Sequence, residues 1–358
     1  MLYRYATSAD GALKLKAKIY TPQEHEISRK DIDPDALKVI RGLVKKGFKA
    51  YVVGGAIRDL LLGRHPKDFD VATDARPKQI RRVFSHARII GRRFRLVHVY
   101  CSPDRYVEVS TFRAGSNPSA GENIYGTLGE DAFRRDFTMN ALFYCPLREY
   151  VIDYVGGVQD IRRRRVRSLT APERSFREDP VRMLRAVKYA AALELKLPVA
   201  VRMAIGRLRE LIRSCSKERL TEEIFKILQS GHAAAILLAA SRLRLLDVLM
   251  PFLQEGGAPL RRVGRSDRFY LRLERLDRGV HRGKSTSRGE MLAVLLADVK
   301  SGDPRWLSGA TAGLVVELRR LMMPLCPSNG DMRGALRFLR KWQQAEAASA
   351  DARAKAEA

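Results

Sequence analysis

The sequence predicts an α+β domain built on a small mixed sheet, followed by an all-helical region. Between residues 35 and about 165, short strand-like runs are interspersed with helical patterns, which is typical of an α+β domain. After residue 167 the strand patterns stop and only helical periodicities follow. At 358 residues the chain is also long enough for two or three domains with their own cores.

The first region contains both kinds of element. The expected strands are 50–53, 69–72, 96–100, 106–112 and 150–154. The expected helices are 36–46, 56–62, 77–84 and 137–144. Residues 1–34 are polar and basic and end in Asp-Ile-Asp-Pro, so we expect an N-terminal arm that leads into the first helix.

Helical patterns dominate the second half. Asp179-Pro180 is typical of a helix start, because Asp is a favoured N-cap and Pro is favoured at the first helical position. We therefore expect domains at 35–167, 168–230 and 231–343, and a frayed or disordered tail at 344–358, where apolar residues are few. The expected helices begin at Asp179 and continue near 198–213, 218–230, 234–249 and 305–323.

The charge balance points to a polyanionic partner. Lys and Arg number 67 against 40 Asp and Glu, a formal charge of +27, and nucleic acid is the first candidate. A solubility role or a membrane-facing basic surface is the alternative. The four cysteines lie far apart without metal-site spacing, the first residues lack a signal-peptide layout, and the longest apolar stretch, 233–240, is too short to span a bilayer. We therefore expect a soluble, cytoplasmic protein with no membrane partner.

The most informative segment begins with a paired-glycine turn. Gly54 and Gly55 follow the apolar run 51–53 and precede a short helical pattern that stops at Gly63. Glycines at a strand-to-helix turn let backbone N–H groups approach a phosphate closely. Arg58, on the first turn of that helix, supplies a bidentate cation. The segment predicts a phosphate-binding turn.

Carboxylates follow in the same segment. Asp68 and Asp70 flank Phe69 in a strand-like run, so alternation is expected to direct both to one face. Glu108 alternates with Tyr106 and Ser110 in another expected strand. If the two strands are neighbours, Glu108 completes a triad able to hold two Mg²⁺ ions for phosphoryl transfer. The alternative for an isolated Asp-x-Asp is a solvated turn.

Two further clusters carry polar groups at expected helix starts. In 134–141, Asp136 is placed to cap a helix that presents Asn140, with Arg135 beside the cap, a set suited to a nucleotide's ribose and phosphates. In 177–185, Asp179 and Arg182 lie three apart on one helix face, where an acceptor and a donor can recognise a base edge. Ordinary capped helices with ion pairs are the alternatives. The arginines at 162–165 suit either RNA phosphates or solvent.

Together these segments, over residues 24–230, resemble the bacterial poly(A) polymerase and CCA-adding enzyme family, the class II nucleotidyltransferases. The resemblance implies a nucleotidyltransferase head or palm domain of polymerase β-like fold, then a helical neck and a helical RNA-binding body. It implies that Gly54, Gly55 and Arg58 hold the triphosphate of ATP. It further implies that Asp68 and Asp70, aided by Glu108, bind Mg²⁺ and catalyse the reaction.

The resemblance also assigns the other two clusters. It implies that Arg135, Asp136 and Asn140 contact the nucleotide's sugar and phosphates. It implies that Asp179 and Arg182 form a base-recognising template. Glu218 and Arg219, in a segment similar to the family's next helical motif, are then expected to support that template.

Two segments resemble the poly(A) polymerase branch more than the CCA-adding branch. They are Glu24–Ile32 and Ile89–Val99, and the second contains Arg92, Arg93 and Arg95, which are available for RNA or triphosphate. The expected activity is template-independent addition of AMP from ATP to RNA 3′-hydroxyl ends. A CCA-adding or partial CCA-adding tRNA nucleotidyltransferase and an inactive RNA-binding scaffold are the alternatives. Helper proteins, such as RNA chaperones or degradosome components, are not readable from the sequence.

Overall fold

The computed structural model describes residues 2–7, 13–91, 95–114, 125–254, 268–299 and 306–357. The chain divides into two compact units, residues 1–171 and 172–358, each of which is described by itself. The division falls close to the boundary expected at residue 167. A further boundary near residue 230, between a neck and a body, stays a prediction.

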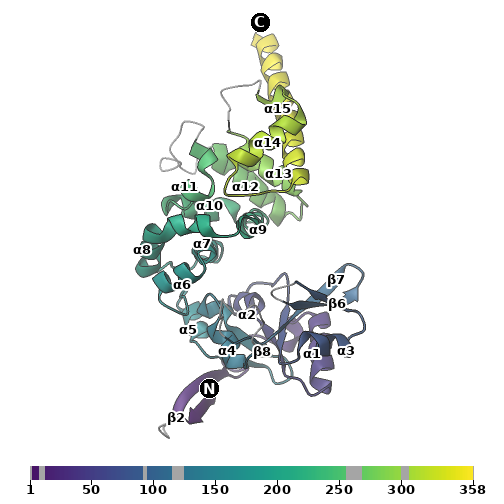
Figure 1. Ribbon diagram of the computed structural model, residues 1–358, viewed down its shortest axis with the longest axis vertical. Coiled ribbons are helices and arrows are strands. Elements are labelled where there is room, and N and C mark those ends of the chain that lie inside the picture. Colours follow the sequence, from purple (N-terminus) through teal and green to yellow (C-terminus); the bar gives the residue numbers. More distant parts are fainter. Residues whose placement is uncertain are drawn as a thin grey trace. The chain divides into compact units, whose positions relative to one another are not determined.

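A mixed sheet forms the centre of the first unit (Figure 1). In the described residues its strand order is β1-β2-β9-β8-β3-β4-β7-β6-β5. Strands β4 and β7 run parallel, and the other neighbouring pairs are antiparallel. The strands are β1 Leu2–Thr7, β2 Leu13–Tyr20, β3 Ala50–Val53, β4 Asp70–Thr73, β5 Ala87–Ile90, β6 Leu96–Ser102, β7 Arg105–Thr111, β8 Leu142–Cys145 and β9 Tyr150–Asp153.

Short helices connect and cover the strands. Helix α1 begins as its sequence predicts, because the Asp33 carboxylate accepts from the backbone N–H groups of Asp35 and Ala36, and Pro34 occupies the first position. Helix α1 packs against strands β3, β4 and β7, and helix α3 packs against strands β5 and β6 (Figure 1). The helices of this unit are α1 Pro34–Lys45, α2 Gly55–Leu61, α3 Pro77–Val83, α4 Leu128–Phe133 and α5 Gly157–Arg162, with 3₁₀ turns η1 Arg29–Asp31 and η2 Thr138–Asn140.

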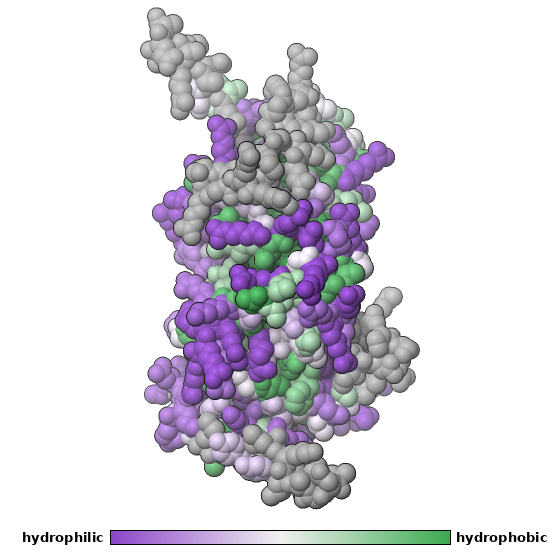
Figure 2. Space-filling view, turned by 90° about the vertical axis from the view of Figure 1, so that its left-hand side faces the viewer, coloured by the Kyte–Doolittle hydropathy of each residue, from purple (hydrophilic) through white to green (hydrophobic). Residues whose placement is uncertain are grey.

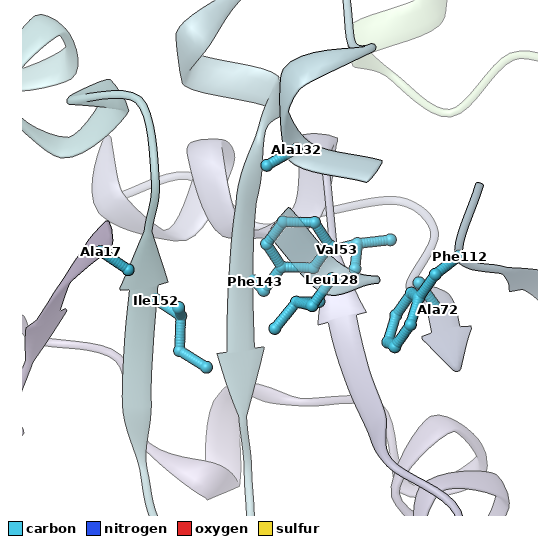
Figure 3. Close-up of a cluster of buried hydrophobic side chains, with 8 residues drawn as sticks. All are labelled: Ala17, Val53, Ala72, Phe112, Leu128, Ala132, Phe143 and Ile152. Carbon is cyan, nitrogen blue, oxygen red and sulfur yellow. The ribbon is translucent and has the colours of Figure 1, made fainter. Parts of the chain in front are cut away.

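An apolar cluster includes Val53, the last residue of β3 (Figure 3). Val53, the residue before Gly54, packs with Phe143 of β8 and Leu128 of α4, and all three are buried. Each such buried side chain contributes on the order of 1.5–3 kcal/mol. The core therefore fixes the point at which β3 ends and the glycine turn begins. The cluster comprises Ala17, Val53, Ala72, Phe112, Leu128, Ala132, Phe143 and Ile152.

The described part of the second unit is helical throughout, as the sequence predicts. Helices α13 and α15 approach closely at two glycines, since a Cβ on Gly289 would lie 2.8 Å from the Cα of Gly334. No helix in the described ranges is both long and apolar enough to cross a bilayer. The helices are α6 Pro172–Glu178, α7 Val181–Ala192, α8 Val199–Leu208, α9 Lys217–Leu228, α10 Ala233–Arg242, α11 Leu246–Leu249, α12 Arg268–His281, α13 Arg288–Leu296, α14 Thr311–Leu321 and α15 Asn329–Glu357, with 3₁₀ turns η3 Arg209–Ser214, η4 Pro251–Gln254 and η6 Trp306–Ser308.

Three expectations about local structure differ from the fold. The N-terminal arm contains β1 and β2, and β2 pairs with β9, because residues 13–20 alternate apolar and basic side chains like a strand. The expected helix at 137–144 is the short turn η2 followed by β8, since β8 pairs with strands on both sides. The tail at 344–358, for which a frayed helix or disorder was expected, continues the regular helix α15 to Glu357, in keeping with its content of Ala, Glu and Lys, which favour helix.

Candidate active site

The glycine turn joins β3 to α2. Gly54 has a φ of 71°, a left-handed conformation that favours glycine. A Cβ on Gly54 would lie 3.2 Å from Nη1 of Arg135, and one on Gly55 would lie 3.4 Å from Nη2 of Arg58. The absence of side chains at these two positions thus leaves the turn's backbone beside two guanidinium groups. The paired-glycine turn predicted from the sequence is confirmed.

Arg58 connects this turn to the segment around Asn140. Its guanidinium is buried, and Nη1 donates to Oδ1 of Asn140 at 2.7 Å, while Nε donates to Oδ1 of Asp59 at 2.8 Å. Asn140 in turn donates from Nδ2 to Oδ1 of Asp136 at 3.0 Å. Arg58, Asn140 and Asp136 are therefore held together in one hydrogen-bond network, although the helix expected to present Asn140 is only the turn η2.

Arg135 joins the same network from the end of α4. Its Nη1 donates to the backbone carbonyl of Asn140 at 3.1 Å, and its guanidinium lies 5.2 Å from the ring centre of Phe143. Nε and Nη2 both donate to Oδ2 of Asp131, at 3.2 and 3.0 Å. The guanidinium of Arg135 is thus fixed on two sides close to the glycine turn.

Asp131 is a site residue that the sequence analysis did not identify. Its carboxylate is 2 % exposed, pairs with both Arg134 and Arg135, and accepts from the backbone N–H of Arg113. Burial raises the pKa of the Asp131 carboxyl, but the charges of Arg135 and Arg134 outweigh burial and hold that pKa below its ordinary value. The available signal was the spacing of an acid three and four residues before two arginines, which are pairing distances on a helix.

The expected metal ligands lie on neighbouring strands. Val71 of β4 pairs with Val109 of β7 in parallel register, so Asp70 and Glu108, one residue earlier on each strand, lie side by side. Asp70 also pairs with Val53, the residue before the glycine turn. Strand β4 begins at Asp70, so the expected strand alternation does not extend back to Asp68, which is exposed.

Two adjacent carboxylates fit a hard cation, because Mg²⁺ prefers carboxylate oxygens. His98 lies directly opposite Glu108 on the neighbouring strand β6, with 3.7 Å between Oε2 of Glu108 and Nε2 of His98. In the described part of the chain, no three His, Cys, Asp or Glu side chains are grouped closely enough to hold a metal ion. The neighbouring strands required for the triad are present, and the role of all three carboxylates as metal ligands stays a prediction.

The expected base-recognition pair lies in the second unit. Arg219 of α9 donates from Nη1 and Nη2 to the two carboxylate oxygens of Asp179, at 3.2 and 2.9 Å. Nε of Arg182 lies 4.0 Å from Oδ2 of Asp179, and its Nη1 donates to Oγ of Ser175 at 3.1 Å. Asp179 precedes α7, and its side chain does not cap that helix in the way the sequence suggested. Arg219 supports Asp179 as expected, whereas Glu218 accepts from Ser216.

The other arginines considered for binding RNA or phosphate lie in the segments 89–99 and 162–165. Arg92 and Arg93 lie outside the described residues, and the Arg95 carbonyl accepts from Arg113 at 3.4 Å. Within the run 162–165, Arg165 pairs with the buried carboxylate of Asp160 at 2.6 Å, which gives this arginine a structural role.

A basic surface lies on the second unit, along α15. Arg333, Arg337 and Lys341 are exposed and lie four residues apart on one face of the helix, where they line a hollow of about 670 Å³. Figure 2 shows that hydrophilic side chains cover much of one face of the molecule, with small apolar patches between them. A row of exposed cations of this kind suits a polyanion such as an RNA backbone.

Comparison with known proteins agrees with these features. Residues 50–167 match the family model described as the poly(A) polymerase head domain, and residues 195–256 match the probable RNA and SrmB-binding site of polymerase A. Poly(A) polymerase I of Salmonella typhi is 41 % identical over 284 residues, covering 74 % of this chain and 61 % of that protein. A CCA-adding enzyme of Bacillus licheniformis is 38 % identical over 217 residues, covering 59 % of this chain and 54 % of that enzyme.

A solved structure extends the comparison to the fold. The crystal structure of the Bacillus stearothermophilus CCA-adding enzyme in complex with CTP aligns with a TM-score of 0.55 and 29 % identity, covering 86 % of this chain and 82 % of that one. The chain spans only about three fifths of the length of the poly(A) polymerase I relative, at 61 %. From the two family regions and these relatives, the chain belongs to the family of bacterial poly(A) polymerases and CCA-adding enzymes, the class II nucleotidyltransferases.

Proposed function

We propose that this protein is a template-independent poly(A) polymerase, which transfers AMP from ATP to the 3′-hydroxyl ends of RNA. The observation that carries the proposal is the pair Asp70 and Glu108, side by side on neighbouring strands of the sheet that holds the glycine turn and its arginines. Carboxylates for a cation beside cations for a phosphate are what phosphoryl transfer requires. A scaffold that only bound RNA would have no use for carboxylates facing a polyanion.

The residues of this chain take distinct parts in the reaction. The backbone of Gly54 and Gly55, with Arg58 and Arg135, binds the triphosphate of ATP, and Asn140 and Asp136 orient its ribose. Asp68 and Asp70 would hold Mg²⁺, which when bound would polarise the α-phosphate and lower the pKa of the attacking hydroxyl. Glu108 assists removal of the proton from that hydroxyl.

Atoms and charges balance in a single displacement. The 3′-oxygen of the RNA forms a bond to the α-phosphorus of ATP, and the bond from that phosphorus to the bridging oxygen breaks. Pyrophosphate leaves, and the chain is longer by one AMP. The fixed guanidinium of Arg135, held by Asp131, needs no reorganisation as charge develops on the phosphates.

We further propose that Asp179 and Arg182 recognise the base. Arg219 holds the Asp179 carboxylate through two hydrogen bonds, and Ser175 accepts a hydrogen bond from Arg182. A donor and an acceptor positioned in this way can match a base edge, provided that their own rotamers are fixed by neighbours. Four cysteines without disulfides support the additional proposal of a cytoplasmic location.

Arg182→Ala is expected to relax the preference for ATP over CTP by about 10-fold or more, because losing a charged hydrogen bond costs about 1.5–3 kcal/mol. The measurement is kcat/KM for each nucleotide on the same oligoribonucleotide. RNA affinity should change little. The matched control is Arg213→Ala, because Arg213 is an exposed arginine that pairs with Glu210. Unchanged ATP-to-CTP discrimination in the Arg182 variant would remove Arg182 from base recognition.

The second candidate function is CCA addition, favoured by the 38 % identity to a CCA-adding enzyme and by the fold shared with the enzyme bound to CTP. Poly(A) addition takes precedence, because the match to poly(A) polymerase I is longer, 284 against 217 residues, at 41 % identity. The two activities differ in nucleotide use and in product length. Both use the same machinery, so the fold does not separate them.

Nucleotide incorporation by the purified protein with Mg²⁺ distinguishes the candidates. ATP alone, CTP alone and both together are offered on a generic oligoribonucleotide and on a tRNA that lacks its 3′ CCA. Long tails on either RNA with ATP alone are expected. A three-nucleotide product confined to the tRNA and requiring both nucleotides would establish CCA addition instead. RNA binding without any incorporation would indicate an inactive scaffold.

A further inference from the structure

Strands β5, β6 and β7 present an aromatic face beside the expected metal ligands. Along β6 and β7 the side chains alternate, so that Val97, Val99, Val107 and Val109 are buried on one face of the sheet. The opposite face carries Arg88, His98, Tyr100 and Tyr106, together called the aromatic face below. Tyr106 is the second residue of β7, close to the turn that joins β6 and β7, and its large ring is 51 % exposed.

Contacts within the aromatic face hold its rings in place. The rings of His98 and Tyr106 are stacked, with centroids 3.9 Å apart and planes 9° from parallel. Tyr100 pairs with Tyr106 across the two strands, and the guanidinium of Arg88 lies 5.3 Å from the Tyr100 ring centre. Each ring of the aromatic face thus contacts a neighbouring side chain. His98 stacks on one face of the Tyr106 ring, and the other face of that ring is available to a ligand. A rigid, exposed ring loses little conformational freedom on binding.

The position of Tyr106 indicates which ligand would meet it. Tyr106 and Glu108 lie two residues apart on the same face of β7, a separation of about 7 Å along a strand. Stacked nucleotides are about 3.4 Å apart. The exposed ring of Tyr106 is therefore one or two stacked nucleotides from the carboxylates at which the RNA 3′ end reacts.

We propose that the aromatic face is a stacking platform for the terminal bases of single-stranded acceptor RNA, with Tyr106 as its exposed contact. This inference rests on the proposed function, since it takes the RNA 3′ end to be the group that approaches Glu108. Aromatic rings on sheet surfaces bind single-stranded RNA without strong base preference, because every base has a face to stack. Arg88 adds a cation at the far side of the platform for a backbone phosphate.

Equilibrium binding of an oligoadenylate with 2-aminopurine at its 3′ end, in the absence of ATP and Mg²⁺, tests the platform. Tyr106→Ala is expected to weaken binding by about 5- to 100-fold, the range found when a stacking ring is removed, and to abolish fluorescence quenching of the probe. Tyr106→Phe should bind like the unaltered protein, because the ring and not the hydroxyl makes the contact. Tyr5→Ala, which removes a 55 % exposed ring from β1, is the control and should bind normally.

An abasic nucleotide at the last or the penultimate position of the RNA identifies the partner of Tyr106. At one of these positions, the abasic change and Tyr106→Ala should not be additive, since each removes the same contact. Because the RNA is altered as well as the protein, the result does not depend on the variant's folding. Additive effects at both positions, or an increase in KM for ATP in place of weaker RNA binding, would overturn the inference.

The outcome separates this inference from the proposed function. If the unaltered protein tails RNA and Tyr106→Ala binds RNA normally, the platform is wrong and the polymerase assignment stands. If the unaltered protein incorporates no nucleotide and the binding effects of Tyr106→Ala and the abasic RNA are still not additive, the platform is supported and the polymerase assignment fails.

Discussion

Asp70→Ala is expected to lower nucleotide incorporation by at least about 100-fold while RNA binding stays largely intact. Removing even an indirect partner of a metal site costs 10- to 100-fold, so loss of a direct ligand should cost at least the upper part of that range. Asp70 is exposed at the start of β4, so its removal should not disturb the core. The measurements are single-turnover AMP incorporation and equilibrium RNA binding on the same preparation.

Asp104→Ala provides the matched control for Asp70→Ala. Asp104 is an exposed aspartate in the turn between β6 and β7. Asp104→Ala therefore removes the same charge but leaves the start of β4, beside the glycine turn, unchanged. Near-normal incorporation is expected from it. Robust polymerisation by the Asp70 variant would overturn the assignment of Asp70 as a metal ligand.

Asp131→Asn should have the largest effect on stability, lowering the free energy of unfolding by about 2–3 kcal/mol. The substitution removes the counter-charge of two guanidinium groups at a buried position. Breaking a fully buried ion pair in this way costs about 3–5 kcal/mol. The Arg134 and Arg135 side chains are 32 % and 18 % exposed, so solvent reduces that cost. Urea unfolding, with hydrogen exchange at residues 128–145, measures the loss and locates it. KM for ATP should rise as well, because Arg135 loses its anchor.

The effect of Asp131 depends on pH in a defined direction. Because the arginines lower the pKa of Asp131 in the folded protein despite its burial, its contribution to stability is complete above the unfolded pKa of about 3.9. As pH falls from there through the lower folded value, the contribution is lost. The stability difference between the unaltered protein and Asp131→Asn should therefore be constant from pH 7 to 5 and should shrink below about pH 4.

Asp247→Asn is the control for Asp131→Asn. Asp247 pairs with Arg244 at the same i, i+3 spacing, but the arginine is 43 % exposed, so a loss of at most about 1 kcal/mol is expected. If the two variants lose equal stability, or if the Asp131 variant is as stable as the unaltered protein, burial of Asp131 is not what holds Arg135.

Local patterns were sufficient for the residues of the glycine turn. Gly54 and Gly55 are placed by a short apolar strand and a left-handed turn, both of which depend on neighbours in sequence. The same holds for α1, whose Asp-Pro start is confirmed. Local patterns also indicated Arg58, Arg135, Asp136 and Asn140, family resemblance gave them nucleotide-binding roles, and the structure joins these four in one network.

Where a prediction failed, a long-range partner decided the structure. Residues 142–145 are an apolar run too short to distinguish helix from strand, and pairing with β3 and β9 makes them a strand. Residues 13–20 alternate like a strand, yet an isolated hairpin is marginally stable, and β9 gives β2 a partner within the sheet. Asp131 was missed because its importance comes from its burial and from the arginines it fixes.

The sequence by itself determined the fold class, the glycine turn, the candidate carboxylates and the basic character of the protein, because these depend on residue type and on spacing within a few positions. Only the tertiary structure decided that β4 and β7 are parallel neighbours, which places Asp70 beside Glu108 although 37 residues separate them along the chain. It also decided that Asp131 anchors Arg135 and that Tyr106 stands exposed beside Glu108. Strand order and burial arise from packing between distant segments, and no local pattern contains that information.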